Sequence, residues 1–326
     1  MTAKFPVGPT GIANPADIAG PADTANAADP TSSTGIAVPP VPSAGQLGAA
    51  LRALAEDIEQ QLSRFRSDSD AARLGRAAGK PVAVGQHTAA VVARAISLRE
   101  VTDGLFDPAP TIRYQRVPTG GSLAPIASSQ TDGAGQHPAG RELQVMADGL
   151  VRLAPPGEPD FGAIGKGYAA DLVLRACRDL GAVAALVAFG VSSISCWAAQ
   201  GQPAWRIGVR SPGSEPNVAL GVLSLRSGAV ATSSNDEQPG HLRDPRTGQP
   251  VDESLVQATV LAPDGMTADA VSTALMVGGL ALAVRLSERL PQVQTILVTP
   301  GAVLASPSLN DIFQVRQRQA HQPVTR

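Results

Sequence analysis

The chain has 326 residues, a formal net charge of −2 and 17% charged residues. It lacks the basic surplus typical of nucleic-acid-binding proteins, and an aromatic content of 3% argues against base-stacking surfaces. Two cysteines, Cys177 and Cys196, and four histidines show no CxxC or HxxxH spacing, which argues against a structural zinc site. We therefore expect neither a nucleic-acid partner nor a zinc site.

The N-terminal segment, residues 1–45, is rich in Ala, Pro, Gly, Asp and Thr and poor in large apolar residues. It cannot bury enough surface to offset its ordering entropy, so we predict a disordered tail. It has no apolar run typical of a signal peptide, and we expect a cytoplasmic protein. The longest apolar run, 270–284, is shorter than the roughly 20 residues of a membrane span, so we expect none.

We expect one folded domain over 46–310, with a C-terminal tail over 311–326. Helical spacing of apolar residues predicts helices over 47–65 and 87–104. A Gly/Ser/Pro/Gln-rich stretch predicts an exposed, flexible loop over 115–140. Alternation around Asp148-Gly149 predicts a hairpin over 142–155.

Further elements follow in the C-terminal half. We predict a helix over 168–180, strands over 182–190, 205–212, 222–234 and 256–265, a long helix over 267–290 and a closing hairpin over 293–306. Strands and helices mix without strict alternation, which favours an α+β (mixed α/β) fold over a regular doubly wound sheet.

The sequence DFGAIGKGYAAD, residues 160–171, places glycines around Lys166 just before a predicted helix. Backbone N–H groups of such a turn can approach a phosphate, and the helix dipole favours an anion there. The spacing matches neither a P-loop nor a GxGxxG fingerprint. Taken alone, these residues therefore favour a tight strand-to-helix turn over a phosphate site.

The sequence TADAVSTALM, residues 267–276, places Asp269 and Thr273 on one helix face. A carboxylate and a hydroxyl suit Mg²⁺, although both residues could simply stabilise the helix terminus. Two loops carry further charged groups: GHLRDPRTGQPV (240–251), which contains His241, and TDGLFDPAP (102–110). A lone histidine in a turn-rich loop is either structural or catalytic.

Taken together and in this order, these stretches resemble the ApbE family of FAD:protein FMN transferases. The family patterns DxGGIAKGYAxD, HIxDPxTGxP, ADAxxTAL and SDGxFDP are similar to the sequences at 160–171, 241–250, 268–275 and 102–108. A further family stretch, SRFRxDSE, is similar to SRFRSDSD at 63–70. The resemblance covers the chain from about residue 49 to residue 304.

This resemblance implies a T-fold-like architecture with FAD in a cleft between two lobes and Mg²⁺ at the pyrophosphate. It places the metal ligands on Asp269, Thr273 and the backbone carbonyl of Ala163. It places contacts to the flavin nucleotide on Asp160, Lys166, Thr232 and His241. The catalytic candidates are then His241 and Asp269.

The resemblance also implies the reaction: FMN passes from FAD to a Ser or Thr hydroxyl of an acceptor protein, and AMP leaves. The chain departs from the family where the flavin or the acceptor would pack, since ATSSND (231–236) replaces ATSGxY and AFGV (188–191) replaces NLGG. A flavin-binding protein without transferase activity and a metal-dependent FAD diphosphatase are therefore alternatives.

Overall fold

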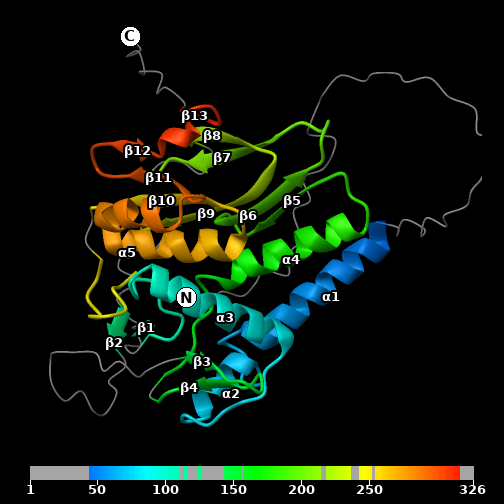
Figure 1. Ribbon diagram of the computed structural model, residues 1–326, viewed down its shortest axis with the longest axis vertical. Helices are drawn as coiled ribbons and strands as arrows, with labels where there is room; N and C mark the ends of the chain where they lie inside the picture. The colour runs from blue at the N-terminus through cyan, green and yellow to red at the C-terminus, as the bar shows by residue number, and fades with distance from the viewer. Residues whose placement is uncertain are drawn as a thin grey trace, which may run out of the picture.

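A six-stranded antiparallel sheet forms the centre of the computed structural model (Figure 1). The structure describes residues 44–110, 114–116, 123–125, 143–155, 157–213, 218–235, 242–251 and 254–315. Across the sheet the strand order is β12 (Val303–Ala305), β11 (Gln294–Val298), β10 (Gln257–Ala262), β9 (Ser227–Ser234), β6 (Ser193–Ala198) and β5 (Ala184–Phe189).

Both faces of this sheet are covered. Helices α4 (Gly165–Asp179) and α5 (Gly265–Arg289) pack on one face, and a small sheet of β13 (Phe313–Val315), β8 (Ala219–Leu225) and β7 (Trp205–Arg210) packs on the other. All six residues of β10 are consequently buried. This explains why its sequence reads as a nearly continuous apolar run rather than an alternating one.

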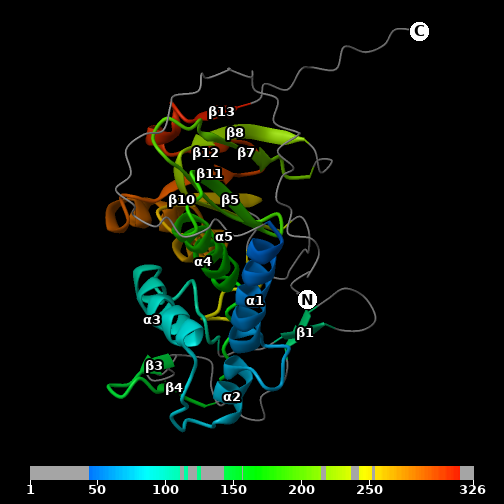
Figure 2. The ribbon, with the colours of Figure 1, turned by 90° about the vertical axis from the view of Figure 1, so that its right-hand side faces the viewer.

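The remaining elements lie on the far side of α4 and α5 (Figure 2). Helix α1 (Ala44–Leu62) contacts α4, and α3 (Gln86–Val101) contacts α5 through a buried apolar face. Beyond them lie α2 (Asp70–Arg76) and the hairpin of β3 (Leu143–Val145) and β4 (Val151–Leu153). A two-stranded pair, β1 (Tyr114–Arg116) and β2 (Leu123–Pro125), and a 3₁₀ turn (Pro307–Leu309) complete the described elements.

The α+β class is confirmed, and most predicted elements lie where their patterns put them. The hairpins at 142–155 and 293–306 form, as β3–β4 and β11–β12. The strand predicted over 222–234 is instead two strands that belong to different sheets, because the chain crosses between the layers at Arg226. The predicted loop over 115–140 contains the β1–β2 pair, and most of its remainder lies outside the described residues.

Three further differences concern elements without a strong local pattern. Strand β6 and helix α2 were not predicted. The domain boundary predicted at residue 310 is too early, because β13 pairs with β8 and buries Phe313 in the apolar layer between the small sheet and the central sheet. The disordered tail predicted over 1–45 lies almost entirely outside the described residues, although α1 begins at Ala44.

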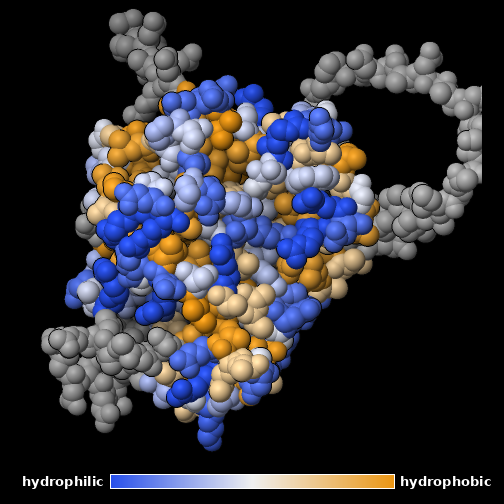
Figure 3. Space-filling view, viewed as in Figure 1, coloured by the Kyte–Doolittle hydropathy of each residue, from blue (hydrophilic) through white to orange (hydrophobic). Residues whose placement is uncertain are grey.

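Helix α5 is the one helix among the described residues whose length and composition would allow a membrane span. Twelve of its residues are buried, and it contacts α3, α4, β9 and β10, so it serves as a core helix. The helix predicted as continuous is interrupted at Gly279, where φ is 59° and ψ is −156°. On the face drawn in Figure 3, hydrophobic residues form patches separated by polar ones.

Candidate functional site

Asp269 is the buried centre of the candidate site. It lies in the second turn of α5 and is 4% exposed. Its Oδ2 accepts a hydrogen bond from Gly167 N–H at 2.6 Å, and its Oδ1 accepts one from Ser193 Oγ at 2.6 Å. Burial raises the pKa of this carboxyl, while the charge of Lys166 and the two hydrogen bonds act in the opposite direction.

Lys166 belongs to the first turn of α4, beside this carboxylate. Its Nζ donates a hydrogen bond to the Gly162 carbonyl at 2.9 Å, so the side chain folds back over its own turn. The ammonium group is near enough to Asp269 to oppose the rise in the pKa of that carboxyl that burial causes. The structure thus brings together Lys166 and Asp269, which lie about one hundred positions apart in the sequence.

Asp160 caps the same turn on its outer side. Its Oδ1 accepts a hydrogen bond from Gly162 N–H at 2.9 Å, and its Oδ2 pairs with Arg64 Nη1 at 2.6 Å. Its own N–H donates to the Pro108 carbonyl at 2.7 Å. The stretches at 63–70, 102–108 and 160–171 therefore meet at one place in the fold.

Thr273 lies one helical turn after Asp269, and its hydroxyl contacts that of Ser233, which in turn contacts Ser272. Ser233 Oγ on β9 is 3.4 Å from Thr273 Oγ1 and 2.9 Å from Ser272 Oγ. Ser272 in turn donates to the Asp269 carbonyl. These hydroxyls give the region around Thr273 several oxygen atoms in a small, half-buried space.

The structure does not bring Thr232 to this group. Side chains alternate along β9, so Ala231 and Ser233 face the helices while Val230 and Thr232 face the small sheet. The Thr232 hydroxyl lies 2.9 Å from Thr259 Oγ1 on the neighbouring strand. The residue of this stretch that faces Thr273 is Ser233.

His241 lies outside the described residues. The loop that follows it is described from Leu242, which packs against the apolar core between the helices and the central sheet. Within that loop Asp244 accepts hydrogen bonds from Arg246, from both the backbone N–H and the guanidinium. The catalytic assignment of His241 stays a prediction.

Sequence reasoning missed a polar network behind α4 that runs from the buried His87 to the exposed side chain of Asp57. His87 Nδ1 is 2.8 Å from Tyr168 Oη, and His87 Nε2 is 3.1 Å from Asp57 Oδ2. These contacts join α3, α4 and α1, and burial raises the pKa of Tyr168. Ser193 was missed as well, because two serines separated by one residue in a short strand give no signal of their own.

The donor set fits Mg²⁺. Each oxygen of the Asp269 carboxylate accepts one hydrogen bond and keeps a second lone pair. Gly167 N–H lies in the first turn of α4, where a helix offers no acceptor of its own, and it donates to Asp269 Oδ2 instead. The Ala163 carbonyl lies just before the N-cap residue of α4, Ile164. The described residues contain no cluster of three His, Cys, Asp or Glu side chains, so a metal here would rely on this mixed set of oxygens, Thr273 included.

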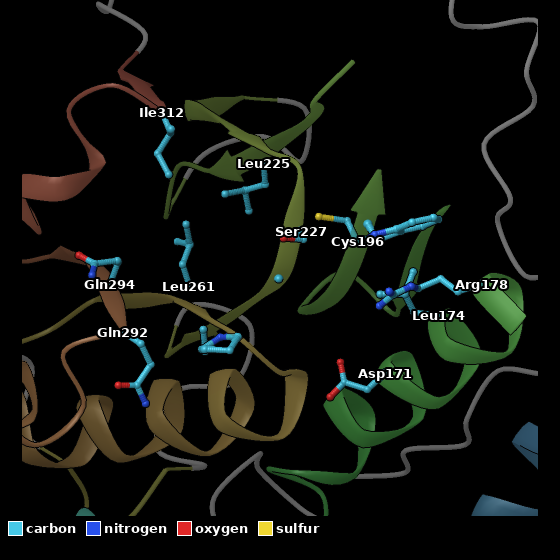
Figure 4. A pocket seen from close by; sticks show the side chains of 14 residues that line it. Asp171, Leu174, Arg178, Cys196, Leu225, Ser227, Leu261, Gln292, Gln294 and Ile312 are labelled. Carbon is cyan, nitrogen blue, oxygen red and sulfur yellow. The ribbon is translucent and has the colours of Figure 1, made fainter. Parts of the chain in front are cut away.

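A groove of about 440 Å³ lies at another place, near the ends of the central strands (Figure 4). Asp171 and Arg178 of α4 line it together with Leu261 of β10. None of Asp160, Lys166, Asp269 and Thr273 lines it. The groove is therefore separate from the candidate site, and a flavin cleft between two lobes stays a prediction.

Comparison with known proteins shows which family the chain is related to. The ApbE family model matches residues 31–297. The chain is 31% identical over 306 residues to a FAD:protein FMN transferase of Treponema pallidum, covering 83% of each chain. It is 30% identical over 247 residues to that of Vibrio cholerae, covering 69% of this chain and 71% of the relative.

Among solved structures, the flavinyl transferase ApbE of Pseudomonas stutzeri, in its apo form, superposes with a TM-score of 0.68 at 24% identity. The match covers 83% of this chain and 89% of that one, and it shows a shared fold. Fold, motif order and sequence similarity agree, and the chain belongs to the ApbE family.

Proposed function

We propose that this protein transfers FMN from FAD to a Ser or Thr hydroxyl of an acceptor protein and releases AMP, with Mg²⁺ as the required metal. The relatives named above are FAD:protein FMN transferases. The observation that carries the proposal is the convergence of the glycine turn at 162–167 with the buried carboxylate of Asp269. A buried acid next to a lysine, at the glycine-rich N-terminus of a helix, suits a metal–phosphate site.

In this proposal Asp269, Thr273 and the Ala163 carbonyl would hold Mg²⁺. When bound, the metal would neutralise charge on the pyrophosphate as its P–O bond breaks. Lys166 would offer a second positive charge to the phosphates. Asp160 would orient the turn through its hydrogen bond from Gly162 and its ion pair with Arg64.

The transfer is a nucleophilic substitution at phosphorus. The acceptor hydroxyl oxygen forms a bond to the phosphorus of the FMN half, and the pyrophosphate bond to AMP breaks. The hydroxyl proton passes to a base, for which His241 is the candidate. AMP is a stable leaving group, so positioning and charge neutralisation supply most of the catalysis.

The test incubates the protein with FAD and Mg²⁺, with and without a protein acceptor that the Vibrio cholerae relative flavinylates. We expect AMP, and a fluorescent acceptor band on a denaturing gel. Asp269→Asn keeps the shape of the side chain and removes its charge. We therefore expect a large loss of turnover and only a small change in melting temperature. Asp179→Ala, an exposed acid of α4, serves as the control.

Other outcomes identify the alternatives. AMP and free FMN in the absence of acceptor would indicate a diphosphatase. Intact FAD bound without AMP release would indicate a flavin-binding protein. Equal turnover by Asp269→Asn and the unmodified protein at saturating Mg²⁺ would refute the metal assignment.

A further inference from the structure

The N-termini of α4 and α5 touch backbone to backbone at two glycines. A Cβ atom placed on Gly167 would overlap the Gly265 carbonyl group and lie 2.9 Å from its Cα. A Cβ atom on Gly265 would lie 2.5 Å from the Gly167 carbonyl oxygen and 2.7 Å from its Cα. Only glycine at both positions allows this close approach.

The two helices exchange hydrogen bonds at this contact. Gly167 N–H of α4 donates to Asp269 Oδ2 of α5 at 2.6 Å, and Gly265 N–H of α5 donates to Asp171 Oδ2 of α4 at 2.7 Å. Each aspartate stands four residues after the glycine of its own helix, in GYAAD and GMTAD. We call Gly167, Asp171, Gly265 and Asp269 the aspartate clasp.

The clasp also caps both helices. The N-cap residue of α4 is Ile164, whose side chain makes no capping hydrogen bond, and Asp269 fulfils that function from the other helix. Helix α5 has its own N-cap, Asp264, which accepts from Thr267 N–H. Asp171 adds an acceptor for the first N–H of α5, which Asp264 does not reach.

Strand β6 fixes both aspartates from the sheet side. Ser193 Oγ donates to Asp269 Oδ1 at 2.6 Å, and Ser195 Oγ donates to Asp171 Oδ1 at 2.7 Å. The two serines are two positions apart, so they share a strand face, and each is 1% exposed. Figure 4 shows the Asp171 side chain leaving α4 on the side of the strands.

We propose that Asp171 is a positioning residue for the reaction, because it fixes the first turn of α5, and with it Asp269 and Thr273, against the glycine turn at 162–167. The proposal rests on the proposed function, since it takes Asp269 and Thr273 as metal ligands. None of the contacts described for Asp171 involves a proposed ligand. Its effect passes through Gly265, one helical turn before Asp269.

The test measures metal affinity directly. Mn²⁺ is titrated into the protein in the presence of ADP, which contains a diphosphate, and the free ion is followed by electron paramagnetic resonance. A titration of ADP alone is subtracted, because ADP binds Mn²⁺ by itself. Loss of a group that orients a metal ligand typically weakens metal affinity by about 10–100-fold, and we expect a change of that order for Asp171→Ala. Asp171→Asn should restore most of the affinity, because its amide can accept from Gly265 N–H and donate to Ser195 Oγ.

Asp179→Ala is the matched control, since Asp179 is an exposed acid at the end of the same helix. All variants are compared below their melting temperatures. If Asp171 had only a structural role, Asp171→Ala would melt earlier but bind Mn²⁺ normally, and that result would overturn the proposal. Should Asp171→Ala not fold, Ser195→Ala decides, and unchanged Mn²⁺ affinity in that variant would overturn it.

A separate measurement distinguishes failure of the clasp from failure of the proposed function. Hydrogen exchange of the amides over 265–269 should become faster in Asp171→Ala and stay unchanged in Asp179→Ala. Unchanged exchange would overturn the clasp, whatever the enzyme does. If the unmodified protein binds no Mn²⁺ and flavinylates no acceptor, the proposed function fails, and the role of Asp171 in it fails too.

Discussion

Gly167→Ala tests the contact between α4 and α5 most directly. The added methyl group would overlap the Gly265 carbonyl, and backbone atoms cannot rotate away as a flexible side chain could. Overpacking of this kind costs about 1–3 kcal/mol. Separating the helices would also weaken the hydrogen bond from Gly167 N–H to the Asp269 carboxylate, and hydrogen bonds to charged groups contribute about 1.5–3 kcal/mol.

Replacing glycine by alanine in a helix recovers up to about 1 kcal/mol. We therefore expect Gly167→Ala to lower the free energy of unfolding by about 2–5 kcal/mol. Gly165→Ala is the matched control two residues earlier: the nearest atom to its added methyl would be Leu62 Cδ1 at 3.7 Å, an ordinary contact. That variant should stay within about 1 kcal/mol of the unmodified protein.

The assay is urea unfolding followed by circular dichroism, with the slope m compared among the three proteins so that a midpoint shift can be converted into free energy. FAD affinity measured on the same samples should fall for Gly167→Ala, because the glycine turn at 162–167 would move together with α4. Equal unfolding midpoints for Gly165→Ala and Gly167→Ala would refute the close helix contact and the reasoning based on it.

Three further predictions follow from individual residues. Lys166→Met should weaken FAD binding by about 5- to 150-fold in a flavin-fluorescence titration with Mg²⁺ present, because the contact of its charge with a phosphate contributes about 1–3 kcal/mol. Unchanged FAD affinity would show that Lys166 does not contact the phosphates. Burial raises the pKa of Asp171 from 3.8 to about 6, with a smaller contribution from the charge of Asp264. The folded state therefore binds the Asp171 proton more tightly than the unfolded state. Relative to Asp171→Asn, the protein should lose up to about 3 kcal/mol of folding stability as the pH rises from about 4 to about 6. Urea midpoints of the two proteins that run parallel across that pH range would contradict the assignment. Gly279→Ala should cost about 1–2 kcal/mol in thermal unfolding because φ is 59° there, and a neutral result would argue for a regular helix at this point.

Local patterns predicted the elements that depend on local chemistry. The Asp103-Gly104 turn ends α3 near the predicted position, and the Asp148-Gly149 turn reverses the chain between β3 and β4. Apolar spacing predicted α1, α4 and α5. These signals are strong because α1 and α4 each have an apolar stripe, α5 is a long and largely apolar segment, and the turns carry residues that only certain backbones accept.

What the sequence could not predict depends on partners far along the chain. Strand β6 is short and rich in serine, and its polar residues are buried only because Asp171 and Asp269 lie opposite them. Thr232 and Ser233 are neighbours with similar side chains, and only the strand register decides that Ser233 faces Thr273. The pairing of Arg64 with Asp160 likewise joins two stretches that no local rule connects.

The place of β13 at the end of the described chain affects how this protein folds while it is being synthesised. Its partner β8 leaves the ribosome long before Phe313 does, yet Phe313 fills part of the apolar layer between the two sheets. Until then β8 has an unpaired edge over Gly221–Leu223, and that edge can pair with other chains. The nascent protein thus carries an aggregation-prone edge from the synthesis of β8 until β13 has followed, and the last described strand is the one that closes it.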